Sequence, residues 1–223
     1  MGFDLDDYRR ALGSLKLPRF AVRPAGSPFI VAIEGSNGAG KTTLCQLLAP
    51  TLNIPYCLGT DAAWFTDAFK LRMIRDADWF ASAMFFLSGC CEQMRQVRAR
   101  TDRLVIMDRS LWSTLAVQAA ESPERLEALI GMLRPIAPLV QIPQLTVVLA
   151  ASFETCQKRI AKKAASDRVL DELTARIGFH AREQAFYHWL LGQVPNLEFV
   201  EVDELKPEEV AKKVLALCRK YQC

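Results

Sequence analysis

The sequence lacks long apolar runs, metal-ligand spacing and a strong excess of one charge. No stretch of its 223 residues approaches the ~18 apolar residues of a membrane-spanning helix. Its two histidines, His180 and His188, are not spaced as metal ligands. A net charge of +3 gives no strong case for a nucleic-acid or membrane partner. The acidic start "MGFDLDDYRR" does not have the apolar core of a secretory signal.

The seven cysteines include no C-x-x-C pair. Cys90 and Cys91 are adjacent in sequence, which is poor geometry for an ordinary disulfide. We therefore expect reduced thiols and a cytoplasmic protein.

Strand-like and helix-like segments alternate along most of the chain. "FIVAIE" at 29–34 is a near-continuous apolar run, typical of a strand buried on both faces. Further strands are predicted at 54–58, 103–108, 145–150 and 197–202, with a last helix from Pro207. This alternation predicts an α/β fold, a three-layer sandwich with a five-stranded parallel sheet.

The first 28 residues differ from the rest and are predicted to be an N-terminal extension. Asp4 to Leu15 can form a short helix, and the linker "LPRFAVRPAGSP" follows it. Residues 29–223 are predicted to form one domain.

A glycine-rich loop follows the first buried strand and opens a helix. "GSNGAGKT", from Gly35 to Thr42, fits the pattern G-x-x-x-x-G-K-[ST]. In that pattern backbone amides and the helix N-terminus hold phosphates, the lysine reaches the β- and γ-phosphates, and the hydroxyl ligates Mg²⁺. The loop therefore predicts an ATP or GTP site. Its phosphate-binding residues are Gly35, Ser36, Asn37, Gly38, Ala39, Gly40, Lys41, Thr42 and Thr43.

Such loops also occur in switches and motors, so the remaining motifs must decide between classes. A GTPase would carry an N-K-x-D motif, which is absent. "LSGCCEQ" at 87–93 is similar to the L-S-G-G-Q signature of transporter ATPases. However, Cys90 replaces its second glycine, and Arg109 stands where those ATPases carry a catalytic Glu. Both classes are disfavoured.

Asp108 and Arg109 end the predicted strand at 103–108. Ligands of open parallel sheets bind beyond the carboxyl ends of the strands. There Asp108 can hold a magnesium-bound water, and Arg109 can clamp an acceptor phosphate. The alternative is an ordinary surface pair.

The segment "DRSLWSTLAVQ" resembles the D-R-Y-x-x-S-x-x-A-Y-Q segment of thymidylate kinases, and "EGSNGAGKTT" resembles their loop. The matching residues of the first segment are Asp108, Arg109, Ser113, Ala116 and Gln118. The resemblance extends from about Phe29 to the C-terminus. It implies a P-loop NTPase fold of the nucleoside monophosphate kinase type, ATP and Mg²⁺ as cofactors, and a homodimer. It also implies acceptor contacts by Asn37, Arg109, Ser113 and Gln118.

A cationic segment at about 158–172 is similar to the lid of that family. Arg159 and Arg168 are expected to close over the γ-phosphate and exclude water from it. Lys162 and Lys163 are equally well explained as a solvated helix face.

Three acceptor-side features depart from the family pattern. The R-E-P-G-G-T run after the second strand is missing, and Asn37 replaces an acidic residue. Cys91 aligns with an arginine that stacks on thymine, a role that a thiol cannot fill. The resemblance therefore implies a nucleoside monophosphate-like acceptor that differs from thymidylate.

Asp61 leaves two alternatives open. Deoxynucleoside kinases, which share the superfamily, place a carboxylate in this region to deprotonate a hydroxyl. Asp61 as a base predicts a kinase for a nucleoside, a sugar or another small alcohol. Its other interpretation is a helix cap. A third hypothesis is an ATP-binding regulatory module without a small-molecule acceptor.

Overall fold

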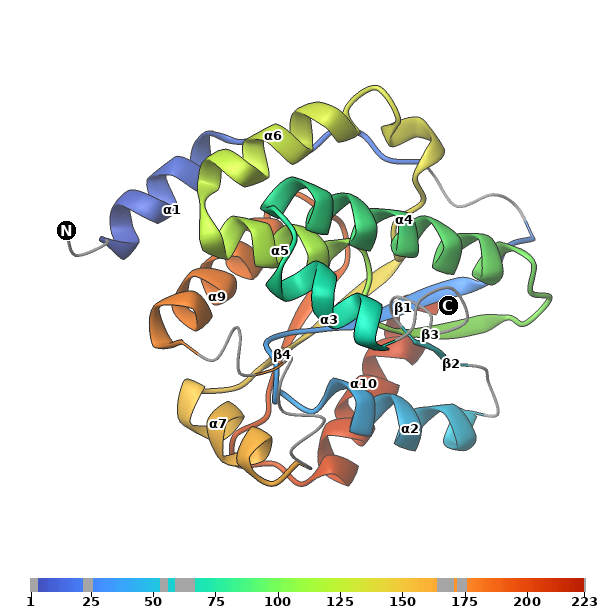
Figure 1. Cartoon of the computed structure of the whole chain (residues 1–223). Coiled ribbons are helices and arrows are strands. Elements are labelled where there is room, and N and C mark those ends of the chain that lie inside the picture. Colours follow the sequence, from blue (N-terminus) through green and yellow to red (C-terminus); the bar gives the residue numbers. More distant parts are fainter. Residues whose placement is uncertain are drawn as a thin grey trace.

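The protein folds around a five-stranded, wholly parallel sheet with the strand order β2-β3-β1-β4-β5 (Figure 1). The computed structural model describes residues 4–21, 26–52, 56–58, 67–163, 171 and 176–222. The strands are β1 (Phe29–Glu34), β2 (Tyr56–Leu58), β3 (Leu104–Asp108), β4 (Leu145–Ala150) and β5 (Leu197–Glu201). Four strands have five or six residues, and the three-residue β2 forms one edge. The predicted parallel α/β sheet is confirmed.

Helices connect the strands and begin at recognisable caps. Asp78 caps α4 by accepting hydrogen bonds from two backbone amides, and Ser152 caps α7 by accepting one from Thr155 N. The last helix begins at Pro207, as predicted. The described helices are α1 (Leu5–Ser14), α2 (Lys41–Leu52), α3 (Asp67–Arg75), α4 (Trp79–Arg98), α5 (Leu111–Glu121), α6 (Pro123–Leu133), the 3₁₀ turn η1 (Ala137–Leu139), α7 (Phe153–Ala161), α9 (Ile177–Leu191) and α10 (Pro207–Gln222).

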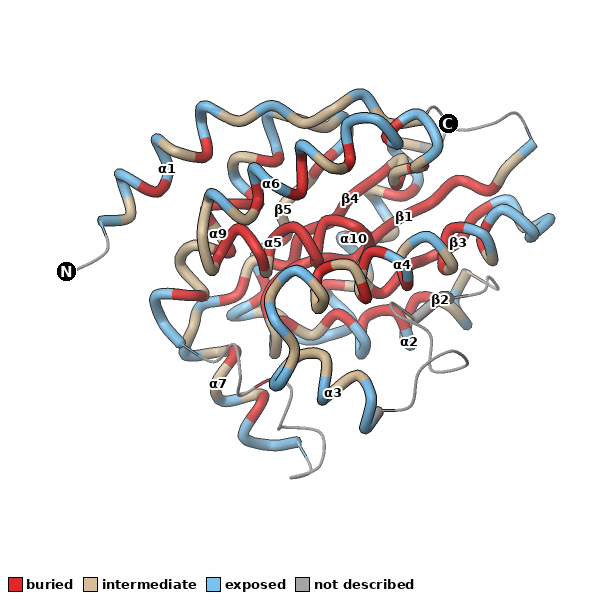
Figure 2. The backbone as a smooth tube through the Cα atoms, turned by 45° about the horizontal axis from the view of Figure 1, so that its top comes forward, coloured by how far each residue is buried: buried red, intermediate tan, exposed pale blue. Residues whose placement is uncertain are grey.

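The sheet is buried on both faces (Figure 2). Alternate residues of β1 point to opposite faces of the sheet. Val31 and Ile33 pack with α2, α7 and α10. Ile30 and Ala32 pack against α4 on the other face. A larger cluster joins α5, α6 and α9 beside the α4 layer. Two-sided burial explains why the strand sequences are continuous apolar runs.

The register of the sheet brings two motifs to one edge. Ile33 of β1 pairs with Asp108 of β3, and both strands run in the same direction. The glycine-rich loop leaves the end of β1, and the Asp108–Arg109 pair lies at the end of the neighbouring strand. Motifs separated by about seventy residues therefore meet beyond the carboxyl ends of the strands.

The N-terminal helix belongs to the packed structure. Asp4 caps α1, and α1 buries Tyr8 and Leu12 against α6 and α9. Further along, Phe20 makes an edge-to-face contact with Trp112 of α5, with the ring centroids 5.6 Å apart. The predicted helix is confirmed, whereas the boundary at residue 28 stays a prediction. Residues 4–21 lie against the outer side of the helical layer formed by α5, α6 and α9 (Figure 1).

Within the described ranges, no helix is long and apolar enough to cross a bilayer. The described cysteine side chains are free thiols, as the sequence predicts: Cys45, Cys90, Cys91, Cys156 and Cys218.

Candidate phosphotransfer site

The glycine-rich loop depends on the absence of side chains at specific positions. Gly35, Gly38 and Gly40 have φ angles of 125°, 84° and 103°, which L-residues adopt only with strain. A Cβ on Gly35 would lie 2.6 Å from the carbonyl oxygen of Leu149, and one on Gly38 would lie 2.6 Å from that of Cys156. Close packing on β4 and α7 therefore fixes the curvature of the loop.

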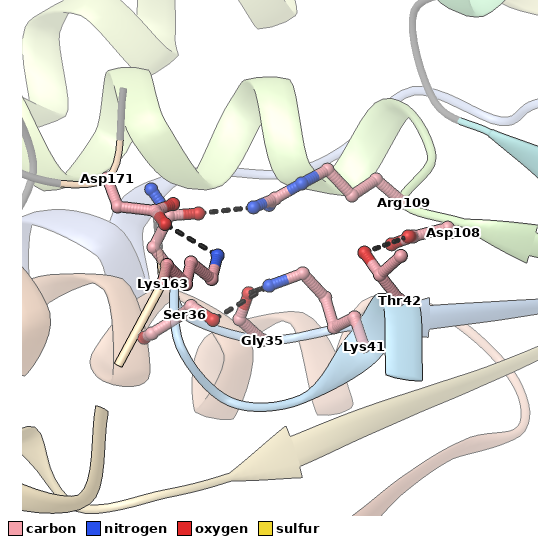
Figure 3. Close-up of polar contacts among 9 residues, drawn as sticks. Gly35, Ser36, Lys41, Thr42, Asp108, Arg109, Lys163 and Asp171 are labelled. Carbon is pink, nitrogen blue, oxygen red and sulfur yellow. Dashed lines mark hydrogen bonds and ion pairs between the residues drawn. The ribbon is translucent and has the colours of Figure 1, made fainter. Parts of the chain in front are cut away.

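Lys41, the first residue of α2, lies inside this loop (Figure 3). Its side chain is buried, and Nζ donates hydrogen bonds of 2.7 Å to the carbonyl oxygens of Gly35 and Ser36. Burial and the nearby charge of Arg109 lower the pKa of Lys41 to about 8. The ammonium group is thus held at the centre of the curved backbone, where a bound phosphate chain would meet it.

Thr42 and Asp108 form the contact between the loop helix and β3. Thr42 Oγ1 donates a hydrogen bond of 2.5 Å to Asp108 Oδ2 (Figure 3). A hydroxyl and a carboxylate are hard oxygen ligands, the kind that Mg²⁺ takes at phosphate sites with few protein ligands. Among the described residues, no cluster of three or more His, Cys, Asp or Glu could hold a metal. The donor set therefore fits magnesium bound together with a nucleotide.

Arg109 has an unusual main chain and a well-defined side chain. Its φ is 74°, in the left-handed region that costs a non-glycine residue about 1 kcal/mol. The backbone N–H donates to Ile33 O at 3.0 Å. The guanidinium extends over the loop (Figure 3). It donates to Asn37 Oδ1 and, at 3.3 Å, to Ser113 Oγ. Arg109, Asn37 and Ser113 are thereby brought together, and their role as acceptor contacts stays a prediction.

Glu34 is a site residue that the sequence reasoning missed. It is fully buried at the end of β1 and accepts hydrogen bonds from Ser110 N at 2.8 Å, Ser110 Oγ at 2.6 Å and Tyr187 Oη at 3.2 Å. Ser113 Oγ also donates to it. Burial raises the pKa of Glu34, and the bonds from Ser110 and Ser113 oppose that rise. The signal was present: a single carboxylate closes an otherwise apolar strand.

A cavity of about 440 Å³ opens beside the loop. Its lining includes Gly38, Gly40, Lys41 and Thr42 of the loop and α2, together with cationic side chains. Apolar residues of β4, of the segment after β5 and of the start of α10 complete the lining: Leu149, Val202, Leu205, Pro207 and Val210. The size and the mixed lining suit a ligand with a flat apolar ring and an anionic tail.

Arg159 of α7 is one of the residues that line this cavity. Its guanidinium donates hydrogen bonds of 2.9 Å to the carbonyl oxygens of Ala39 and Val202, so it joins the loop to the end of β5. Lys163, also in the lining, pairs with Asp171 at 2.6 Å (Figure 3). Arg159 therefore contacts the loop from a formed helix, whereas the sequence had assigned it to a closing lid.

The structure does not bring every predicted site residue to this cavity. Gln118 is buried on α5 and is not among the described residues that line the cavity. Asp61 and Arg168 lie outside the described residues. On α4, Cys91 is exposed, and Cys90 faces α5 with Sγ 3.8 Å from Thr114 Oγ1. The alignment of Cys91 with the thymine-stacking arginine stays a prediction.

The parallel sheet, the loop around Lys41 and the Thr42–Asp108 contact define the class of P-loop nucleotide-binding proteins. Residues 31–174, more than half of the chain, match the family model of deoxynucleoside kinases. The chain therefore belongs to the deoxynucleoside kinase and thymidylate kinase family of P-loop nucleotide kinases. It is a phosphotransferase of a family that uses ATP.

Individual relatives support the same family. The thymidylate kinase of Thermomicrobium roseum is 31% identical over 201 residues, covering 84% of this chain and 93% of that protein. The probable thymidylate kinase of Methanospirillum hungatei JF-1 is 27% identical over 195 residues, covering 82% and 90%.

Solved structures share the fold. The thymidylate kinase of Candida albicans superposes with a TM-score of 0.69 at 20% identity, covering 87% of this chain and 92% of that one. A deoxyadenosine kinase of M. mycoides with bound dATP gives 0.63 at 17% identity, covering 85% and 99%.

Proposed function

We propose that the protein transfers the γ-phosphoryl group of ATP to a nucleoside monophosphate-like acceptor. The observation that carries this proposal is the convergence of three groups at one sheet edge. Lys41 lies inside the loop, Thr42 contacts Asp108, and Arg109 reaches over the loop to Asn37. Positioning and charge stabilisation are what phosphoryl transfer demands of a protein.

On the donor side, the loop and Lys41 bind the phosphates of ATP. On ATP binding, Lys41 Nζ replaces its bonds to the carbonyl oxygens of Gly35 and Ser36 by bonds to phosphate oxygens. The buried ammonium group then has anionic hydrogen-bond acceptors. The apolar lining residues Leu205 and Pro207 contact the base. We retain Arg168 of the predicted lid at 158–172 as the group that closes over the γ-phosphate.

Thr42 and Asp108 would hold Mg²⁺, Thr42 directly and Asp108 through water. The ion would neutralise phosphate charge as the transferred group moves. The 2.5 Å contact between Thr42 and Asp108 supports this assignment, because it brings the two oxygen groups to one point.

On the acceptor side, Arg109 binds and orients the acceptor phosphate. Its guanidinium is half-buried between Asn37 and Ser113, so little side-chain freedom remains to be lost on binding. The bidentate geometry of a guanidinium matches a phosphate, and an ionised phosphate acceptor needs no general base.

A second candidate is a deoxynucleoside acceptor, favoured by the environment of Glu34. A hydroxyl acceptor benefits from a carboxylate base, and burial, opposed by the hydrogen bonds from Ser110 and Ser113, raises the pKa of Glu34. To reach it, the hydroxyl would replace Ser113 or Tyr187 at Oε2. Glu34 thereby joins Asp61 as a candidate base.

An ATP-consumption screen against nucleosides, nucleoside monophosphates and simple alcohols tests these proposals, with Lys41→Ala as the blank. A monophosphate kinase loses acceptor affinity in Arg109→Ala and keeps most turnover in Glu34→Gln and Asp61→Asn. A nucleoside kinase loses turnover by about 100-fold or more when its base is replaced. ATP binding without stimulation by any acceptor would favour the regulatory-module hypothesis.

We also retain the homodimer as a proposal. Phe69 of α3 and Phe80 of α4 are large apolar side chains with 45% and 43% of their surface exposed. A pairing surface across these helices would cover them. Sedimentation equilibrium tests this, and a monomer at micromolar concentration would contradict it.

A further inference from the structure

Gln93 is a buried polar residue in an apolar layer. It lies on α4 with 1% of its surface exposed. The next residue, Met94, packs with Val97 against β1 and β3. An amide placed there loses its hydration, and the loss is tolerated only where hydrogen bonds replace water.

The side chain of Gln93 contacts the main chain of Arg109. Its Nε2 donates a hydrogen bond of 3.3 Å to the carbonyl oxygen of Arg109. On the other side, the N–H of Arg109 donates to Ile33 O. The peptide units on both sides of the left-handed residue, whose φ is 74°, are therefore held by neighbouring elements.

This arrangement matters because Arg109 occupies a one-residue joint. β3 ends at Asp108, and Ser110 caps α5. A rotation of the Arg109 main chain would swing its guanidinium away from Asn37 and Ser113. Asp108 is held in β3, and Ser110 is held as the N-cap of α5. The hydrogen bond from Gln93 restrains the carbonyl group of Arg109, which lies between them.

We propose that Gln93 is a positioning residue that holds Arg109 in the left-handed conformation required for acceptor binding. This inference rests on the proposed function, in which Arg109 binds the acceptor. Gln93 acts through the main chain of Arg109 and does not touch the substrate. Its replacement therefore changes acceptor affinity more than ATP affinity, because Arg109 touches the phosphate loop only through Asn37.

The test is a double-mutant cycle on the full-length protein. Gln93→Met keeps the length of the side chain and removes the donor, and Arg109→Ala removes the side chain that Gln93 positions. Gln96→Met is the matched control, because Gln96 is on the same helix and bonds to Glu92. KM for the accepted nucleoside or nucleotide, KM for ATP and kcat are measured in each variant.

The expected result is a rise of about tenfold in the acceptor KM of Gln93→Met, with a smaller change in the KM for ATP. In the Arg109→Ala background, Gln93→Met has no further effect, because the residue through which it acts is gone. Gln96→Met retains the parental values. Equal effects of Gln93→Met with and without Arg109, or a change in the KM for ATP instead, would overturn the inference.

A structural readout separates this inference from the proposed function. In protein labelled with ¹⁵N-arginine, the Arg109 amide resonance is identified by its loss in Arg109→Ala. It should shift or broaden in Gln93→Met and stay in place in Gln96→Met. This holds even if no acceptor is found in the screen. An unmoved Arg109 resonance in Gln93→Met would refute the positioning role, whatever the protein phosphorylates.

Discussion

Thr42 and Asp108 lie 66 positions apart in the sequence, and their side-chain oxygens are 2.5 Å apart in the fold. One belongs to the first turn of α2, and the other ends β3. The contact exists because β1 and β3 are parallel neighbours in register, so the segments that follow them emerge at one edge. It gives the phosphate loop an acidic partner beside the place where a nucleotide-bound metal would lie.

Replacing Asp108 by Asn should lower phosphoryl transfer by about 100-fold, because the neutral amide no longer balances the charge of Mg²⁺. Activity across a magnesium titration is the measurement. The matched control is Asp102→Asn, since Asp102 is half-exposed and pairs with Arg100 away from the loop. Equal activity of both variants at every magnesium concentration would contradict the assignment of Asp108.

Gly38→Ala should destabilise the fold by about 2 kcal/mol or more. The new Cβ would meet Cys156 O at 2.6 Å, and alanine would have to adopt a φ of 84°. Gly131 on α6 provides the comparison, because a Cβ there meets nothing within 4 Å. Gly131→Ala should stabilise the helix by ~0.5–1 kcal/mol. Urea denaturation measures the change in the free energy of unfolding of each variant. An unchanged stability of Gly38→Ala would mean that the loop does not pack closely on α7.

ATP affinity should weaken above about pH 8. Burial and Arg109 lower the pKa of Lys41 to about 8, so the free protein loses the ammonium charge as the pH rises through that value. The dissociation constant for Mg-ATP should therefore increase by up to about tenfold per pH unit above 8. Calorimetric titrations between pH 6.5 and 9.5 measure it.

Lys41→Arg is the control for this titration, because a guanidinium stays charged throughout the range. Its affinity for Mg-ATP should be lower overall and flat with pH. The same shift has a consequence for folding. The unfolded chain binds the Lys41 proton more tightly, so the contribution of Lys41 to stability increases as the pH rises from about 8 to 10.5. A pH-independent affinity in the parent protein would contradict the role of the Lys41 charge.

The N-terminal helix should contribute to global stability. Leu12 is 1% exposed within the cluster of α1, α6 and α9. Leu12→Ala should cost about 2–4 kcal/mol by leaving a cavity. Arg9→Ala, on the exposed face of the same helix, should change stability by less than about 0.5 kcal/mol. Thermal denaturation compares the two, and equal melting temperatures would show that residues 4–21 are loosely attached.

Much of the fold could be predicted from local signals. The residue types of Phe29–Glu34 and of the Gly35–Thr42 loop are enough to predict the strand, the turn and the start of the helix. The side-by-side placement of Asp108 and the loop also followed, because parallel strands end at one edge.

Contacts between distant side chains could not be predicted in this way. Glu34 was overlooked because its partners come from α5 and α9, and a single sequence does not reveal them. The contact of Cys90 with Thr114 depends on how α4 packs against α5, which the sequence does not reveal. Arg159 was assigned to a mobile segment, whereas its bonds to Ala39 and Val202 depend on how α7 packs against the loop.

The most direct test of the account is phosphoryl transfer from radiolabelled [γ-³²P]ATP to a panel of nucleosides and nucleoside monophosphates, with product separation by chromatography. We expect a labelled product with at least one panel member in the presence of magnesium, and none with Lys41→Ala. Failure of the folded parent protein to label any panel member, or equal labelling by Lys41→Ala, would contradict it.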